Sequence, residues 1–287
     1  MMNVNAFLKN KYYLFLYPII AFLFLLISST SISPIYPPCT KDDSLFILIG
    51  KSILDGKILY KDLFDHKGPV LFYMDSLGQL IYPDQTGAFI YTVINLSIIL
   101  YVIRKISLFF IKPNQIWIII ASFLSLFFIT NEGNSNESKS LLFIFIPLFL
   151  ILKYYFSNKK SHPLLYSFIY GICSSLVIFI RINNAVALCA IILSLVIFLI
   201  INKEWKNLLF NTLTFLFSFI LICFIICFYF YINNAFYDMI EGTFLHNLKY
   251  ASIDSFQVEL IVIVSFAITI FALINIYIYI ERERRNR

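Results

Sequence analysis

The stretch 164–201 constrains the fold of this chain most, because its 38 residues are apolar except for one short polar break. That break is Arg181-Ile182-Asn183-Asn184. A membrane-spanning helix needs about 20 apolar residues, so the stretch is too long for one span and suits a tight hairpin of two. Over all 287 residues, 60% are apolar and 13% are charged. Such a composition excludes a soluble globule and a disordered chain, and it indicates a protein embedded in lipid.

The fold class predicted from these apolar runs is an all-α integral membrane protein with about eight transmembrane helices. Residues 1–287 are interpreted as a single polytopic membrane domain. The first apolar run is longer than that of a signal peptide, so we interpret it as a retained anchor. The predicted spans are 12–32, 87–103, 113–130, 140–156, 164–180, 185–201, 208–232 and 258–280.

The basic residues predict how these spans are oriented, because cytoplasmic segments carry an excess of Lys and Arg. With both termini in the cytoplasm, 14 basic residues fall on inner segments and three on short outer segments. The first loop, 33–86, then lies outside, together with most acidic residues. We therefore expect a multi-pass protein of the cell membrane and cell envelope, whose chemistry takes place on the extracytoplasmic face. The net charge of +6 follows from this topology, and no nucleic-acid partner is expected.

Two amphipathic helices are predicted within the first outer loop. Residues 44–54 carry a band of apolar side chains on one face, with Ser44 as the N-cap after Asp42 and Asp43. Residues 69–82 begin with a proline, which suits the first turn of a helix. Helices of this kind lie in the membrane interface rather than across it.

The five cysteines predict no disulfide framework, since their number is odd and their spacing shows no pairs. Cys223 and Cys227 share a helix face without a His or acidic partner, so they are interpreted as small core residues. The sequence contains neither a zinc pattern nor a glycine-rich phosphate loop, so a nucleotide-sugar donor is not expected. No cofactor is identified, and dependence on a divalent metal is left open.

The first loop also contains distinctive strings of polar and aromatic residues. They are Asp42-Asp43-Ser44-Leu45-Phe46, Gly50-Lys51, Leu54-Asp55-Gly56-Lys57, Tyr60-Lys61-Asp62 and Phe64-Asp65-His66-Lys67-Gly68-Pro69. This series resembles the first loop of bacterial GT-C glycosyltransferases, the multispanning enzymes related to protein mannosyltransferases and lipid A aminoarabinose transferases. Weaker similarities to the same family lie in Gly133-Asn134-Ser135-Asn136-Glu137, in Arg181-Ile182-Asn183-Asn184 and in the segment 238–250.

The resemblance implies a sugar donor linked to polyprenyl phosphate, a lipid or glycan acceptor, and contact with membrane lipids. In that family the acidic residue after the first span is catalytic, which implies Asp42, with Asp43 as the alternative. Lys67-Gly68-Pro69 matches the family's Lys-x-Pro turn. The candidate substrate-binding residues are Lys67, Arg181, His66, Tyr60, Asp65, Glu137 and Asn183.

The chemistry of such a transfer needs a base for the acceptor hydroxyl and cations for the phosphate. Asp42 or Asp43 is expected to supply the carboxylate, and Lys67 and Arg181 the positive charge. Structural alternatives remain open for each residue. The two aspartates can cap a helix, Lys67 can extend its ammonium to the membrane interface, and His66 can hydrogen-bond within its loop. Arg181 has the weakest structural alternative, because a cation between two apolar spans is unfavourable near lipid.

The leading interpretation is therefore an inverting membrane glycosyltransferase with an aspartate as general base. One alternative is a non-catalytic or truncated membrane subunit, because members of that family are usually longer and contain further spans. Another alternative is a transporter or flippase for lipid-linked saccharides. Transporters usually place polar or broken helices at mid-membrane, whereas the charges here cluster at one surface.

Overall fold

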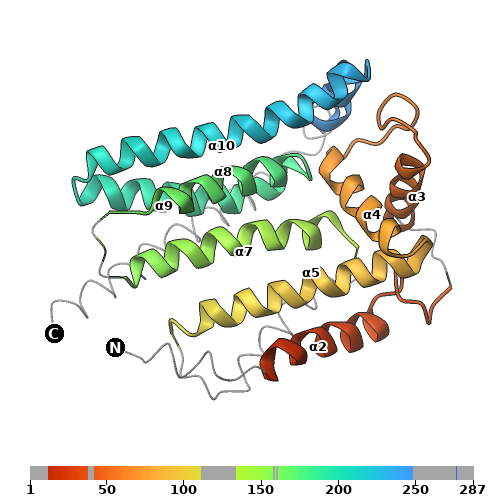
Figure 1. The fold of residues 1–287 in the computed structure, drawn as a ribbon, viewed down its shortest axis with the longest axis horizontal. Coiled ribbons are helices and arrows are strands. Elements are labelled where there is room, and N and C mark those ends of the chain that lie inside the picture. The colour runs from red at the N-terminus through yellow and green to blue at the C-terminus, as the bar shows by residue number, and fades with distance from the viewer. Residues whose placement is uncertain are drawn as a thin grey trace, which may run out of the picture. The chain divides into compact units, whose positions relative to one another are not determined.

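The computed structural model describes residues 12–37, 42–110, 134–157, 159, 161–247 and 276. Within these ranges every regular element is a helix (Figure 1). The prediction of an all-α chain is confirmed for this part of the molecule. Two predicted spans, 113–130 and 258–280, lie outside the described residues apart from Ile276.

Four of the described helices are long and apolar enough to cross a membrane. They are α5 (Asp84–Ser107), α7 (Asn136–Tyr155), the segment Ile182–Ile201, which includes α9 (Ala185–Ile201), and α10 (Trp205–Ile232). Two shorter apolar helices accompany them, α2 (Tyr12–Ser28) and α8 (Leu164–Ile178). Length and composition thus support association with a membrane, while the number of eight spans stays a prediction.

Several helices differ from the predicted spans at their ends. Helix α10 begins at Trp205 rather than at residue 208, and α7 begins at Asn136 rather than at residue 140. Helix α2 ends at Ser28, four residues before the predicted boundary. Polar residues in a terminal turn can face water, so hydropathy alone places helix ends imprecisely.

The contacts within the chain divide it into two compact units, and the prediction of a single domain stays a prediction. Unit 1 comprises Met1–Asp55 and Phe72–Leu142, and unit 2 comprises Gly56–Leu71 and Phe143–Arg287.

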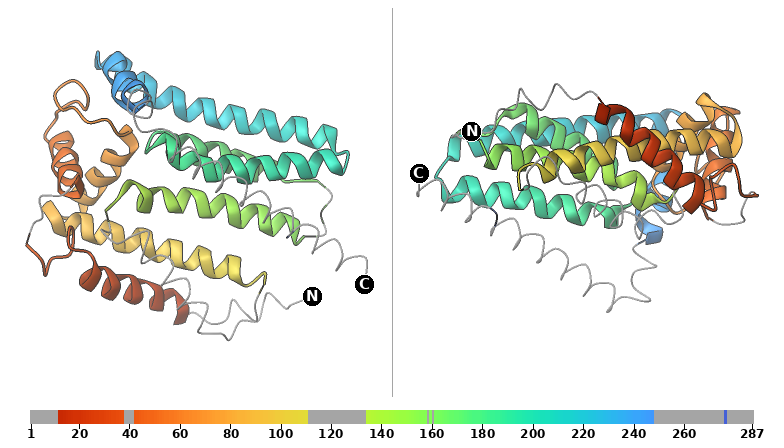
Figure 2. Two further views of the ribbon diagram at one scale, coloured as in Figure 1. Left: turned by 180° about the vertical axis from the view of Figure 1, so that it is seen from behind. Right: turned by 90° about the horizontal axis from the view of Figure 1, so that it is seen from below.

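In unit 1, α2 packs against α5 (Figure 2). The rings of Phe22 and Phe89 meet edge to face, with centroids 5.5 Å apart. Near the other end of the pair, the guanidinium of Arg104 donates a hydrogen bond of 3.2 Å to the hydroxyl of Tyr17. Apolar packing is therefore combined with a buried polar contact that fixes how the two helices are aligned.

The two helices predicted in the first loop are confirmed as α3 (Asp42–Leu54) and α4 (Pro69–Ile81). Helix α3 begins at Asp42, so Ser44 is not its N-cap and both aspartates lie in its first turn. Carboxylates are favourable there because the helix dipole is positive at that end. Within unit 1 the two helices approach closely, because a β-carbon added at Gly50 would lie only 2.9 Å from the β-carbon of Asp75.

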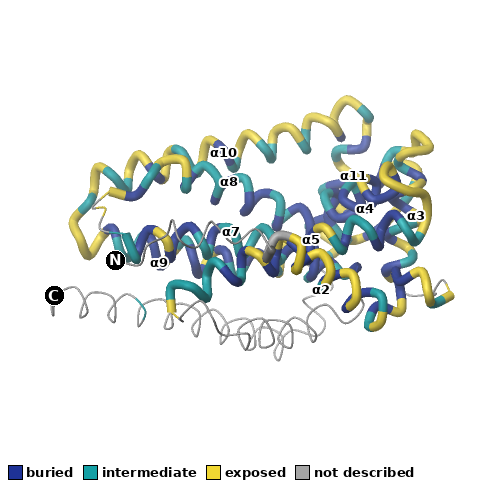
Figure 3. The backbone as a smooth tube through the Cα atoms, turned by 60° about the horizontal axis from the view of Figure 1, so that its bottom comes forward, coloured by how far each residue is buried: buried dark blue, intermediate teal, exposed yellow. Residues whose placement is uncertain are grey.

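In unit 2, α8, α9 and α10 lie alongside one another (Figure 1). The close approach of α8 to α10 depends on Gly171, because an added β-carbon would lie 2.0 Å from the Ser218 hydroxyl oxygen. The predicted hairpin is confirmed: α8 ends at Ile178, and a 3-10 turn, Ile182–Asn184, leads directly into α9. Much of α10 is exposed (Figure 3), as a helix facing lipid would be.

A buried polar cluster joins the loop before α8 to the first turns of α10. The ring of His162 is 2% exposed, with Nδ1 2.8 Å from the side-chain oxygen of Asn211 and Nε2 3.2 Å from the Tyr170 hydroxyl. Its backbone N–H donates to Asn207 at 2.8 Å. Burial lowers the pKa of His162 to about 4, although the Asn211 hydrogen bond opposes the shift. The imidazole is therefore neutral at pH 7 and serves as a structural connector.

Candidate functional site

The loop between Gly56 and α4 folds back on itself in unit 2 and is fixed by Tyr60. This residue has a positive φ of 70°, and its N–H donates to the carbonyl of Leu63 at 2.6 Å. Its hydroxyl donates to the carbonyl of Lys67 at 2.6 Å and lies 3.1 Å from the hydroxyl of Thr243. Burial raises the pKa of Tyr60 well above its usual range, so the phenol stays protonated and connects the loop to residue 243.

Asp65, His66 and Lys67 form a compact charged group within this loop. The Asp65 carboxylate is buried and accepts a hydrogen bond of 2.9 Å from the backbone N–H of Lys67. The same oxygen lies 3.8 Å from the Lys67 ammonium nitrogen and 3.8 Å from Nδ1 of His66. One buried carboxylate therefore faces two basic side chains, of which His66 is about half exposed.

The turn Lys67-Gly68-Pro69 lies directly against the end of α8. The N–H of Gly68 donates to the carbonyl of Ile180 at 3.1 Å, and that of Val70 donates to the carbonyl of Phe179 at 3.0 Å. These bonds place Lys67 beside the segment that continues into Arg181. The structure thus brings the backbone segments that carry Lys67 and Arg181, the two predicted phosphate-binding cations, next to each other. Their separation in the sequence could not have established this.

A further pair of polar residues reaches this group from the end of the π-helical turn η2 (Glu241–Leu245). The ring of His246 lies 5.3 Å from that of His66, measured between centroids. The side chain of Asn247 donates to the carbonyl of His66 at 2.7 Å. His246 was missed as a candidate because a single histidine in an aromatic and apolar stretch has no recognisable motif around it. Its proximity to His66 follows only from the fold.

The surrounding charges change the titration of His66. Partial burial lowers its pKa, and the positive charge of Lys67 lowers it further. Asp65 opposes this effect, while His246 and Arg181 add to it. The imidazole of His66 is therefore held largely neutral at pH 7.

The remaining candidates occupy different positions. Asn183 is exposed on the 3-10 turn of unit 2, two residues after Arg181. Glu137 lies in unit 1, in the first turn of α7, and its backbone N–H donates to the side-chain oxygen of Asn136 at 3.1 Å. Asp42 is exposed in the first turn of α3, whereas Asp43 beside it is 2% exposed.

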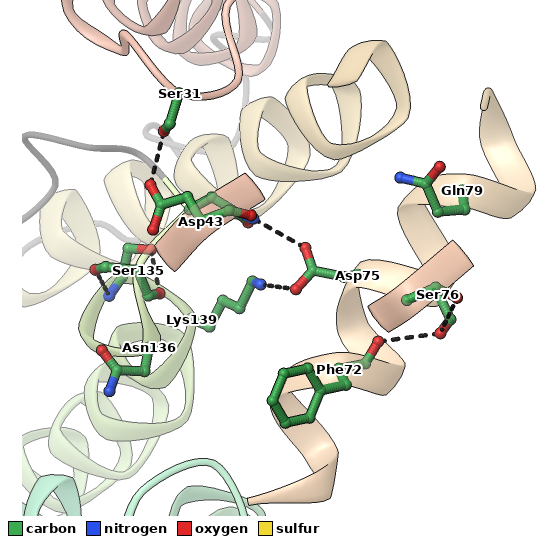
Figure 4. A network of polar contacts seen from close by, with 12 residues as sticks. Ser31, Asp43, Phe72, Asp75, Ser76, Gln79, Ser135, Asn136 and Lys139 are labelled. Carbon is green, nitrogen blue, oxygen red and sulfur yellow. Dashed lines mark hydrogen bonds and ion pairs between the residues drawn. The ribbon is translucent and has the colours of Figure 1, made fainter. Parts of the chain in front are cut away.

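Asp43 belongs to a buried polar network in unit 1 (Figure 4). Its carboxylate accepts a hydrogen bond of 2.7 Å from the hydroxyl of Ser31. The side-chain amide of Asn134 donates to the Asp75 carboxylate at 3.1 Å and reaches the backbone carbonyl of Asp43 at 3.5 Å. This environment favours a structural role for Asp43 and leaves Asp42 as the aspartate that is open to solvent.

The centre of that network is an ion pair between Asp75 and Lys139, and both side chains are almost completely buried (Figure 4). Burial raises the pKa of Asp75, while Lys139 and Asn134 act in the opposite direction. The ammonium also lies 5.6 Å from the centre of the Phe46 ring. Neither partner was a candidate site residue, because nothing in the sequence shows that positions 64 residues apart meet.

Among the residues that the structure describes, no three His, Cys, Asp or Glu side chains gather in a way that could hold a metal ion. Comparison of the chain with protein-family models, with curated proteins and with solved structures finds no match.

Proposed function

We propose that this protein is a membrane glycosyltransferase that moves a sugar from polyprenyl phosphate to a lipid or glycan acceptor at the extracytoplasmic face, with inversion. The single observation that carries the proposal is the polar cluster of unit 2, in which the buried Asp65 carboxylate faces Lys67 and His66, and the charge of Arg181 acts on His66. The cluster lies at the end of the apolar helix α8. A ligand with a phosphate head and a long apolar tail matches both features.

The phosphate would be bound by the cations of this cluster. Arg181 presents a planar fork that suits two phosphate oxygens, and Lys67 adds a compact charge. Asp65 holds the ammonium of Lys67 at 3.8 Å and so positions it. Tyr60 maintains the loop geometry through its hydrogen bond to the Lys67 carbonyl. Asn183 and Glu137 are retained as candidates for contacts with the sugar or acceptor.

The general base would be Asp42. Transfer requires a carboxylate that can take the proton of the acceptor hydroxyl as the sugar–phosphate bond breaks. Asp42 is exposed in the first turn of α3, whereas Asp43 is buried and hydrogen-bonded to Ser31. The accessible carboxylate suits proton transfer from an external acceptor, and Asp43 is the alternative base.

Release of polyprenyl phosphate is the decisive measurement, because it detects transfer without knowledge of the acceptor. Purified protein is incubated with a panel of polyprenyl-phosphate sugars and membrane lipid extract, and the freed polyprenyl phosphate is quantified by mass spectrometry. The Asp42→Asn variant should lose release by about 100-fold or more. Asp55→Asn is the matched control, because Asp55 is exposed just beyond the other end of α3. No release by the wild-type protein from any donor contradicts the proposal.

The position of the buried ion pair gives little support to the alternative that the protein is a transporter. The ion pair of Asp75 and Lys139 involves the first turn of α7 rather than its middle. Transporters usually place such groups at mid-membrane, on broken helices. The glycosyltransferase is therefore the function that the described residues support best.

A further inference from the structure

The imidazole rings of His66 and His246 form a pair in unit 2, although the residues come from distant parts of the sequence. Their centroids lie 5.3 Å apart and their planes differ by 30°. Both side chains are exposed, so a ligand can reach them from outside the protein. The ring of Phe64 meets that of His246 edge to face, with centroids 6.2 Å apart. The pair is thus held in place yet accessible.

Charged groups of both signs lie around the pair. Asp65 and Lys67 face it from the loop, and Arg181 acts on it from the hairpin between α8 and α9. The segment of His246 itself carries Glu241 one π-helical turn earlier, and that residue is exposed. Two protonated imidazoles beside Lys67 and Arg181 would repel one another and both cations. Without a bound ligand, His66 therefore remains largely neutral, because its pKa is lowered by partial burial and by Lys67.

An arriving anion reverses this balance, because a negative charge within reach favours the protonated imidazole. We infer that His66 and His246 together hold the phosphate of a lipid phosphate monoester and take up a proton when that phosphate binds. The inference rests on the proposed function and adds His246 to its site. A lipid rather than a soluble phosphate is favoured because the cluster adjoins the end of the apolar helix α8.

The proton has a defined place in the proposed reaction. The bond between the sugar carbon and the phosphate oxygen breaks, and the acceptor oxygen forms the new bond to that carbon. The acceptor proton moves to the general base. The phosphate changes from a diester with one negative charge to a monoester that gains a second, and a proton from solvent on the imidazole pair balances the new charge. Tighter binding of the monoester than of the diester stabilises the leaving group selectively.

The test measures proton uptake directly. The full chain is placed in nanodiscs of neutral lipid, and farnesyl phosphate is titrated by calorimetry in two buffers with different heats of ionisation. We expect net proton uptake by the wild-type protein at pH 7. Inorganic phosphate should bind at least about tenfold more weakly, a difference of about 1.4 kcal/mol. Equal affinities for both probes would assign the site to a soluble phosphate and overturn the lipid assignment.

Two substitutions separate titration from packing. His246→Phe preserves an aromatic ring beside His66 but cannot be protonated, so it should reduce proton uptake and weaken binding by about tenfold. His246→Arg provides a permanent charge, so it should keep the affinity while losing part of the uptake. A purely structural role for His246 would not produce these opposite changes. Lys57→Gln is the control, because Lys57 is exposed in the turn after α3.

The outcomes distinguish this inference from the proposed function. If binding depends on Lys67 and Arg181 while His246→Phe binds and takes up protons like the wild type, the inference is wrong and the proposed function stands. If the wild-type protein binds farnesyl phosphate with proton uptake but releases no polyprenyl phosphate from any donor, the imidazole pair is supported and the transferase proposal is wrong. If no farnesyl phosphate binds at any pH, both are overturned.

Discussion

The backbone N–H of Gly68 donates a hydrogen bond of 3.1 Å to the carbonyl of Ile180, which joins the loop before α4 to the hairpin after α8. A β-carbon at Gly68 would lie 2.0 Å from the carbonyl oxygen of Phe179, a distance that no packing rearrangement of a side chain can relieve. The absence of a side chain at this position therefore allows Lys67 to lie beside the segment that carries Arg181.

Replacing Gly68 by alanine should detach this turn. The added methyl group would collide with backbone atoms, and overpacking of this kind costs about 1–3 kcal/mol or more. We expect a lower melting temperature in detergent and weaker binding of lipid phosphate. Gly56→Asn is the control, since Gly56 has a positive φ of 88° with open space around it and asparagine tolerates that conformation. Equal melting temperatures for Gly68→Ala and the wild type would contradict the close contact.

Removing one partner of the buried ion pair should destabilise unit 1. Lys139→Met leaves the Asp75 carboxylate buried without its cation, and such a change typically costs about 3–5 kcal/mol. The double variant Lys139→Met with Asp75→Leu should recover much of this loss, because two apolar side chains need no mutual compensation. Chemical denaturation in detergent measures all three proteins. A double variant no more stable than Lys139→Met would show that the pair is not the cause.

The same variant should have a characteristic pH dependence. Burial raises the pKa of Asp75 above its usual 3.8, and the loss of Lys139 removes the largest opposing influence. The folded state then binds the proton more tightly than the unfolded state, so stability is highest at low pH and falls as pH rises above about 4. Melting temperatures of Lys139→Met at pH 4 and pH 7 check this sign. A higher melting temperature at pH 7 than at pH 4 would show that burial of the ionised Asp75 carboxylate does not destabilise this variant.

His162 should make the folded state sensitive to acid in the opposite sense. Its pKa is lowered to about 4 from 6.5, so the unfolded chain binds the proton more tightly between these values. The stabilisation is present above about pH 6.5 and is lost as pH falls toward 4, up to about 3 kcal/mol. The variant His162→Gln should be less stable at pH 7 but lose less stability on acidification. Parallel melting curves of both proteins across this range test the prediction.

The sequence predicted the helices of this chain better than its polar contacts. The hairpin around Arg181 and the helices α3 and α4 follow from local patterns of apolar residues, and the structure contains all three. The pairing of Asp75 with Lys139 depends instead on which helix faces meet, and periodicity within one helix cannot specify that. The burial of Asp43 and the approach of His246 to His66 are of the same kind. Local sequence patterns predict individual helices, whereas a site built from distant segments can be recognised only once the tertiary structure is known.

The predicted orientation can be tested with cysteine labelling in intact cells. The excess of basic residues on one set of segments places the loop 33–86 outside and Lys159 inside. A membrane-impermeant maleimide should therefore label Cys39, which lies outside the described residues, and should not label a cysteine introduced by Lys159→Cys. Permeabilised cells are the control, in which both positions should react. The reverse pattern would place the charged loop in the cytoplasm and remove the basis for chemistry at the outer face.

The final prediction concerns the chemical type of the cation at position 181. Arg181→Lys keeps the charge but replaces a planar fork by a single ammonium, so two-point contact with phosphate is lost. We expect its affinity for farnesyl phosphate to fall about tenfold, and that of Arg181→Gln to fall further, about 100-fold, because the charge is lost as well. Both variants should melt close to the wild-type temperature, since Arg181 is only partly buried at the hairpin. The control is Lys203→Gln, because Lys203 is exposed just after α9. Arg104→Lys would not be suitable, because Arg104 is buried against Tyr17. Binding isotherms at pH 7 in neutral nanodiscs give the comparison. If lysine and arginine support equal affinity, position 181 contributes charge alone, and the proposed two-point contact with the phosphate is wrong.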